Sequence, residues 1–157
     1  MSEPKKIASF EVDHRYIVPG IYLSRVDGDI TTLDLRFCRP NAGVYLDNLT
    51  MHTVEHLFAT YVRSSHIGSQ VIYFGPMGCR TGFYLLVRNC DLDSITETVK
   101  DILQLIVAHE GPVFGASEIE CGNYRELDLY SAQKAASAYL AALNANGKTD
   151  LSYPKPQ

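Results

Sequence analysis

The stretch that most limits how this chain can fold is residues 49–62, LTMHTVEHLFATYV, which has the spacing of an amphipathic helix. Residues three and four apart share one face of a helix, so His52, Glu55 and His56 form a single polar stripe. We therefore predict that this polar stripe faces inward between apolar flanks. The apolar residues on the neighbouring stripes are Val54, Leu57, Phe58 and Tyr61.

Three other stretches have the composition and period of β-strands. Apolar residues alternate with polar ones in GDITTLDLRF, residues 28–37, which predicts a strand with one buried face. The β-branched and aromatic runs at 69–74 and 80–88 predict two more strands. Because only the turn-forming sequence GPMGC lies between these two runs, we expect them to be adjacent in the sheet.

Helix signals then complete the predicted fold. The first helix should span about 48–64, with Asn48 or Thr50 as its N-cap, and the capping-box pattern SITE predicts a second over 94–108. An alanine-rich helix should end at Gly147 as its C-cap. Strands mixed with three helices predict an α+β fold, a two-layer sandwich with helices on one face of a mostly antiparallel sheet.

Length and charge narrow the possible functions. The 157 residues fit one domain, 1–157, whose polar tail from about 148 to 157 we expect to fray. The net charge is −4 and no basic cluster exceeds Lys5–Lys6, which argues against nucleic acid as a partner. With no apolar run of about 18 residues and no apolar leader, we expect no membrane span and a cytoplasmic location. The four widely spaced cysteines are expected to be free thiols or metal ligands.

The helical stripe has the chemistry of a metal site. Two imidazoles at positions i and i+4 can ligate one divalent ion, which needs a third ligand from elsewhere. Cys121, in EIECGN, is the candidate, because its segment has little apolar content to bury a structural thiol. Two histidines and one thiolate leave an open fourth position, which is the pattern of a catalytic site. Cys38 or Cys90 could close the site, but each ends a strand pattern and resembles a small apolar filler.

A second chemical feature is Cys79 in GPMGCRTGF. Glycine and proline bracket this thiol, which predicts a tight exposed turn. A thiol beside a cation or metal can serve as base or nucleophile, and Arg80 is the next residue.

Two other interpretations use part of this pattern. The order H-x-x-E-H is that of inverzincin metallopeptidases, in which Glu55 would be the general base and Glu118 or Glu120 could supply a carboxylate ligand. Peptide hydrolysis has no use for Cys79, however. A non-catalytic metal-binding module would instead require four protein ligands and would not depend on Glu55.

Five segments of the chain occur together in an order and spacing that is highly specific. They are SFEVDH at 9–14, DLRFCRPN at 34–41, HTVEHL at 52–57, PMGCRTGFYL at 76–85 and ECGN at 120–123. Together they cover nearly the whole chain, and they resemble one family closely, the S-ribosylhomocysteine lyases of the LuxS type.

This resemblance implies a homodimer with one divalent metal ion per subunit near the interface, iron(II) by preference, with zinc or cobalt able to replace it. It also implies four groups of site residues. The metal ligands would be His52, His56 and Cys121, the acid/base pair Glu55 and Cys79, the residues around the ribose Ser9, His14 and Arg36, and the residue at the homocysteine end Arg63.

The resemblance further implies a carbon–sulfur lyase reaction. The metal would polarise sugar carbonyl oxygens while the carbonyl moves from C1 to C3, and β-elimination would then release homocysteine. The other product would be 4,5-dihydroxy-2,3-pentanedione, the precursor of the quorum-sensing signal autoinducer-2. We expect one chain of the dimer to supply the metal, Glu55 and Cys79, and its partner to supply Ser9 and His14. Tyr73 and Leu127 depart from residues found in some members.

Overall fold

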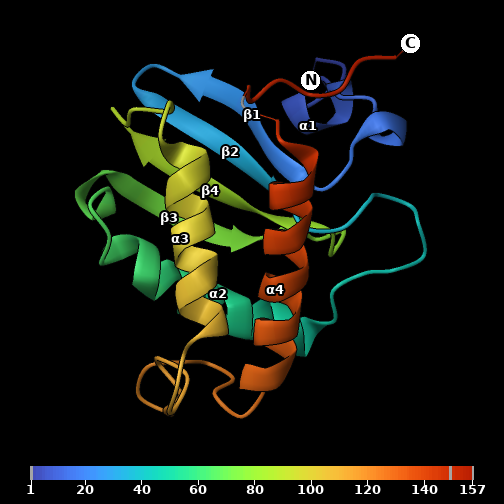
Figure 1. Ribbon diagram of the computed structural model, residues 1–157. Helices are drawn as coiled ribbons and strands as arrows, with labels where there is room; N and C mark the ends of the chain where they lie inside the picture. The colour runs from blue at the N-terminus through green and yellow to red at the C-terminus, as the bar shows by residue number, and fades with distance from the viewer. Residues whose placement is uncertain (1, 149, 157) are drawn as a thin grey trace.

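A four-stranded antiparallel sheet organises the computed structural model over the residues it describes, 2–148 and 150–156 (Figure 1). The strand order is β1-β2-β4-β3, and every neighbouring pair is antiparallel. The strands are β1 Gly20–Asp27, β2 Ile30–Arg36, β3 Val71–Pro76 and β4 Gly82–Arg88. The α-helices are α1 Ala8–Glu11, α2 Asn48–Arg63, α3 Ile95–Val107 and α4 Leu129–Asn146.

The three long helices cover one face of this sheet, which confirms the predicted α+β sandwich (Figure 1). Alternate residues of a strand point to opposite faces, so Leu33 and Leu35 of β2 face the helices and are fully buried. Leu85 of β4 lies beside them in register with Leu33. The core between the layers is completed by Val54, Leu57 and Phe58 of α2, Val99 and Leu103 of α3, and Ala136 and Tyr139 of α4.

The opposite face of β2 is unusual because it buries charge. Asp34 and Arg36 alternate with the apolar residues of β2, and their exposed fractions are only 0% and 3%. Ser9 of α1 lines a pocket with Arg36, and Tyr153 of the C-terminal tail bonds to Asp34. Segments from both ends of the chain therefore lie against this face.

The structure corrects three local predictions. Strand β1 was not predicted, although the Asp27–Gly28 dipeptide is a hairpin signal and Gly28 has the left-handed φ of +62° that such a turn requires. The N-cap of α2 is Asp47, one residue before the predicted candidates, and its carboxylate accepts a hydrogen bond from the Thr50 amide. Ser94 precedes α3 as predicted, but its side chain makes no capping hydrogen bond.

The C-terminal tail was expected to fray from about 148, and the structure shows otherwise for its middle part. The Leu23 amide donates to the Leu151 carbonyl at 2.7 Å, which extends the edge of the sheet. The Tyr153 ring stacks on Tyr22 with centroids 4.8 Å apart. Aromatic stacking thus holds the tail against β1. Residues 149 and 157 of the segment that was expected to fray lie outside the described residues.

Within the described part of the chain, no helix is long and apolar enough to cross a membrane.

The Asp47 cap leads to a stability prediction. Hydrogen bonds from the Thr50 side chain and amide lower the pKa of Asp47 from its ordinary 3.8. The carboxylate therefore stabilises the fold above that pH, and this contribution is lost as the pH falls through the lower folded-state value. We expect Asp47→Ala to lower the free energy of unfolding by about 1 kcal/mol at neutral pH, and by less below about pH 3. Urea unfolding at both pH values measures the difference. Asn48→Ala is the matched control, and an equal loss in that variant would contradict the assignment.

Candidate metal centre and active site

Hydrogen bonds to backbone carbonyls fix the orientation of both α2 histidines. Nδ1 of His52 lies 2.8 Å from the Glu126 carbonyl oxygen, and Nδ1 of His56 lies 2.7 Å from that of Phe114. A carbonyl oxygen only accepts, so each Nδ1 must carry the proton. Each Nε2 is then left with a free lone pair, which is the form in which imidazole binds a metal.

Cys121 joins these two histidines from a loop distant in sequence. Its sulfur lies 3.3 Å from Nε2 of His52, and the ligating atoms of His52, His56 and Cys121 all lie within 4.8 Å of one another. Bonds of about 2.0–2.3 Å from a tetrahedral ion to nitrogen and sulfur place ligand atoms between about 3 and 4 Å apart. The three donors therefore fit one divalent ion, and among the described residues no fourth His, Cys, Asp or Glu joins the group.

The loop between α3 and α4 is built around this cluster. Gly115 has a φ of +71°, and a Cβ at this position would lie 3.1 Å from Nδ1 of His56, so glycine lets the loop approach the ring. The buried His109 holds the same loop: it bonds to the Tyr61 hydroxyl at 2.6 Å and to the Pro112 carbonyl at 2.9 Å. Sequence reasoning did not find Gly115 and His109, because their role depends on contacts with distant residues that their spacing in the sequence does not show.

Glu55 is half-buried on the same helix face, between the two histidines in sequence. The group of atoms that could hold one ion consists of two imidazole nitrogens and one sulfur, without the Glu55 carboxylate. Glu55 therefore shares the helix face of this group without belonging to it, and a carboxylate in such a place can accept and return protons.

Cys79 lies in a different place, on the exposed turn between β3 and β4, as predicted. It lines two pockets that both contain His14 and Arg36. The first has a volume of about 280 Å³ and the second, which also contains Ser9 and Tyr84, of about 320 Å³. The structure thus brings three other predicted site residues, Ser9, His14 and Arg36, into the pockets around the Cys79 thiol.

Arg36 is the charged centre of this second group. Burial alone would lower the pKa of Arg36, but hydrogen bonds to Asp34 and the charge of its carboxylate raise the value overall. Its guanidinium also donates to the Thr81 hydroxyl at 2.9 Å. A fully charged guanidinium therefore lies under the pocket, where it can stabilise negative charge on a bound sugar or thiol.

The two groups occupy separate regions of the chain. Neither pocket that contains Cys79 is lined by His52, Glu55, His56 or Cys121. In Figure 1, α1, which carries Ser9, lies at the top of the molecule, and the loop that carries Cys121 lies at the bottom. Within one chain, Cys79 therefore lines pockets with Ser9 and His14, whereas the expected division of the dimer groups it with the metal ligands.

Comparison with known proteins identifies this arrangement. The family model described as S-Ribosylhomocysteinase (LuxS) matches residues 7–150. The chain belongs to the LuxS family. It is 41% identical over 156 residues to the S-ribosylhomocysteine lyase of Borreliella afzelii, covering 96% of this chain and 99% of that protein. The lyases of Finegoldia magna and Desulfotalea psychrophila are 41% and 39% identical, with the same coverage of 96% and 99%.

Arg63, which the LuxS resemblance places at the homocysteine end, has a structural contact in this chain. Its guanidinium donates to the carbonyls of Val71 and Ile72 at 3.2 Å and 2.9 Å, which ties the end of α2 to β3. The neighbouring Tyr73 is exposed by 53%, whereas Leu127 is half-buried. Arg63 thus lines neither of the two pockets with Cys79.

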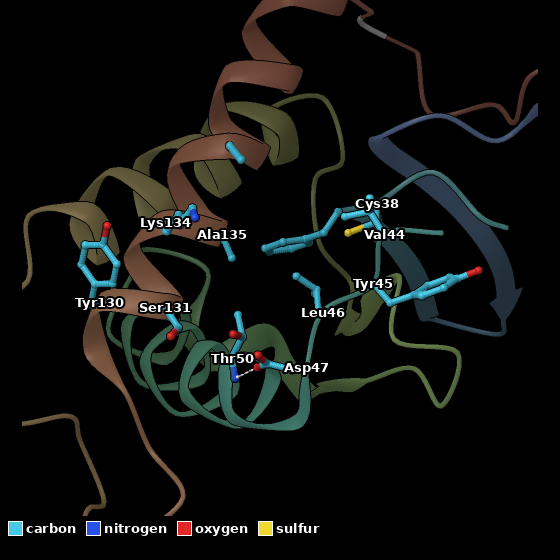
Figure 2. Close-up of a pocket in the computed structure, with 12 residues that line it drawn as sticks. Cys38, Val44, Tyr45, Leu46, Asp47, Thr50, Tyr130, Ser131, Lys134 and Ala135 are labelled. Atoms are coloured by element: carbon cyan, nitrogen blue, oxygen red, sulfur yellow. Dashed lines mark hydrogen bonds between the residues drawn. The ribbon is translucent and has the colours of Figure 1, made fainter. Parts of the chain in front are cut away.

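A larger pocket of about 440 Å³ lies apart from the LuxS site residues, between the start of α4 and the segment 38–47 (Figure 2). Its walls are mostly apolar, and Tyr45 is its one residue shared with the pockets around Cys79. Cys38 lines this pocket, and burial raises the pKa of its thiol, so the thiol stays protonated at neutral pH. Neither Cys38 nor Cys90 joins the His52 cluster; both pack against the apolar core.

Proposed function

We infer that this chain is an S-ribosylhomocysteine lyase, a carbon–sulfur lyase that releases homocysteine and 4,5-dihydroxy-2,3-pentanedione. The observation that carries this inference is the cluster of His52, His56 and Cys121 in a LuxS-family chain, with ligating atoms within 4.8 Å of one another. The relatives named S-ribosylhomocysteine lyase align over nearly the full chain, which supports the same activity here.

The substrate's own chemistry explains why such a site is needed. The thioether sulfur is bonded to C5 of the ribose, and it can leave only if the proton on C4 becomes acidic. The carbonyl must therefore move from C1 to C2 and then to C3, by removal of a proton from one carbon and its return to the neighbouring carbon. Once the ketone is at C3, loss of the C4 proton breaks the C5–S bond, and the sulfur takes up a proton to give homocysteine.

Each group of site residues would carry out a different part of this reaction. A divalent ion held by His52, His56 and Cys121 would supply a Lewis acid that polarises the sugar carbonyl oxygens. Glu55 and Cys79 would remove and return the protons on carbon. The charge of Arg36 would stabilise the enediolate that forms at each transfer, with Ser9 and His14 binding the ribose hydroxyls. An inverzincin-type peptidase would use Glu55 but leaves Cys79 and Arg36 without a role.

The metal that we propose is iron(II), one ion per subunit, on the strength of the family resemblance. A set of two imidazoles and one thiolate also accepts zinc and cobalt, so these ions should support activity when substituted. The four free cysteines fit a reducing compartment, and we propose that the protein works in the cytoplasm and supplies the precursor of autoinducer-2.

We further propose that the working enzyme is a homodimer with shared sites. The separation of the two groups within one chain supports this, because proton transfer requires Cys79 to reach a substrate held at the metal. A twofold dimer can bring the metal group of one protomer to the Cys79 group of its partner. In this arrangement one chain supplies the metal ligands and Glu55, and its partner supplies Cys79, Arg36, Ser9 and His14.

The function is tested by incubating purified, metal-loaded protein with S-ribosylhomocysteine and following free thiol over time. We expect one thiol released for each substrate consumed. The matched control is the substrate analogue that lacks the C1 carbonyl, in which carbonyl migration cannot begin and no thiol should appear. Absence of thiol release from the true substrate by a fully metal-loaded protein would overturn the proposed function.

A further inference from the structure

The buried ion pair on β2 is held in one fixed geometry. Arg36 donates to both carboxylate oxygens of Asp34, through Nε at 3.0 Å and through Nη2 at 2.6 Å. Side-chain exposure is 3% for Arg36 and 1% for Asp34. A buried two-point contact between a guanidinium and a carboxylate sets the plane of both groups. The position of Arg36 therefore depends on what holds Asp34.

The same guanidinium reaches Cys79 through one hydroxyl. Nη1 of Arg36 donates to Oγ1 of the buried Thr81 at 2.9 Å, and the Cys79 sulfur lies 3.0 Å from that oxygen. Because a guanidinium has no acceptor, the hydroxyl must accept from Arg36, and its own proton is free to point at the sulfur. A hydrogen bond donated to sulfur favours the thiolate over the thiol. Arg36 thus acts on Cys79 through Thr81.

A tyrosine of the C-terminal tail makes a further contact with the ion pair, on the Asp34 side. The Tyr153 hydroxyl donates to Oδ2 of Asp34 at 2.7 Å, the same oxygen that accepts from Nη2 of Arg36. The Tyr153 ring is held by stacking on Tyr22, and the Leu151 carbonyl anchors the segment on β1. The tail thereby supplies a third hydrogen bond to Asp34 that neither β2 nor β4 provides.

We propose that Tyr153 is a positioning residue for Cys79, acting through Asp34, Arg36 and Thr81 so that the tail keeps the thiol in its reactive form. The proposal deepens the proposed function, since it rests on Cys79 as a proton-transfer group. The step needs no bond to break: Tyr153 keeps its proton and only fixes the carboxylate that orients Arg36. Without its hydroxyl, one lone pair of a buried carboxylate loses its partner and the fixed geometry loosens.

The charged groups near this thiol are Arg80, which is the next residue in the chain, and the ion pair below the pockets. Desolvation and the nearby Asp34 charge raise the pKa values of the tyrosines around the ion pair, so they are neutral at neutral pH. Asp34 and Arg36 are thus the charged pair under the Cys79 pockets. The other charged or titratable groups facing the pair or the thiol come from three places. Arg80 follows Cys79 and lies over the Tyr45 ring at 5.7 Å, and His14 and Tyr45 line the pockets. Tyr22, Tyr84, Tyr139 and Tyr153 surround Asp34.

The test measures the reactivity of Cys79 itself, without substrate. Iodoacetamide alkylation of the Cys79 peptide is followed by mass spectrometry across a pH series in the full-length, metal-loaded protein. We expect Tyr153→Phe, which keeps the ring and removes the hydroxyl, to slow alkylation at neutral pH about fivefold. Tyr130→Phe, at a tyrosine exposed by 74%, is the matched control and should leave the profile unchanged.

A double-mutant cycle decides whether the effect travels through Thr81. Thr81→Val alone should shift the Cys79 profile at least as far as Tyr153→Phe does, and Tyr153→Phe should add nothing in the Thr81→Val background. Additive shifts, or a wild-type profile in folded Tyr153→Phe, would overturn the proposal. Because alkylation needs no turnover, these outcomes are distinct from a failure of the lyase assay, which would overturn the proposed function instead.

Discussion

Glu55→Gln and Cys79→Ala are each expected to lower the turnover of S-ribosylhomocysteine by at least about 10²-fold while leaving the metal content unchanged. The physical reason is that, in the proposed function, each residue transfers protons on carbon without being a ligand. In the described part of the chain, the ligating atoms within 4.8 Å of one another come from His52, His56 and Cys121. Glutamine keeps the size of Glu55 but cannot accept a proton at neutral pH, and alanine removes the Cys79 thiol from an exposed turn.

Two cysteine variants serve as controls for this result. Cys121→Ala removes one of three ligands and should strip the metal at neutral pH, whereas Cys38→Ala should retain both metal and activity, because Cys38 packs against the core. Elemental analysis and the thiol-release assay are run on the same samples. Metal loss in Glu55→Gln or Cys79→Ala would reassign that residue to the ligand set. Near-normal turnover would remove it from the mechanism, and full metal retention in Cys121→Ala would refute the ligand assignment.

The sequence was most informative where chemistry depends on short-range periodicity. The helical spacing of His52, Glu55 and His56 puts them on one face whatever the rest of the chain does, and α2 confirms this. The cysteine in GPMGC was predicted on an exposed turn for a similarly local reason, and it lies on one. Helix α4 also ends where Gly147 predicts, because its φ of +58° suits glycine.

The sequence was least informative where a site depends on contacts between distant segments. His52 and His56 are oriented by carbonyls of Glu126 and Phe114, and a carbonyl is the same in every residue. Tyr153 reaches Asp34 across 119 positions of sequence, and a polar tail gives no local sign of such docking. The spatial grouping of Cys79 was also missed, because that depends on the β3–β4 turn meeting the N-terminal segment.

The arrangement of groups within the chain leads to an expected result for mixed dimers. Glu55→Gln and Cys79→Ala should each be nearly inactive alone, yet a refolded equal mixture should regain activity. Random association makes half of the dimers mixed, and each mixed dimer holds one site in which both residues are intact. About a quarter of wild-type activity should therefore return, by the twofold symmetry of the proposed dimer.

A second mixture provides the matched control for the shared site. Cys79 and His14 line the same pockets of one chain, so Cys79→Ala mixed with His14→Ala leaves every site with a damaged partner group. That mixture should stay inactive, although its subunits exchange as freely as those of the first. Exchange is verified with two differently tagged chains that co-purify after refolding. If exchange is complete and the pattern is reversed, with recovery only in the second mixture, Cys79 acts from the same chain as the metal and the proposed division of the site is wrong.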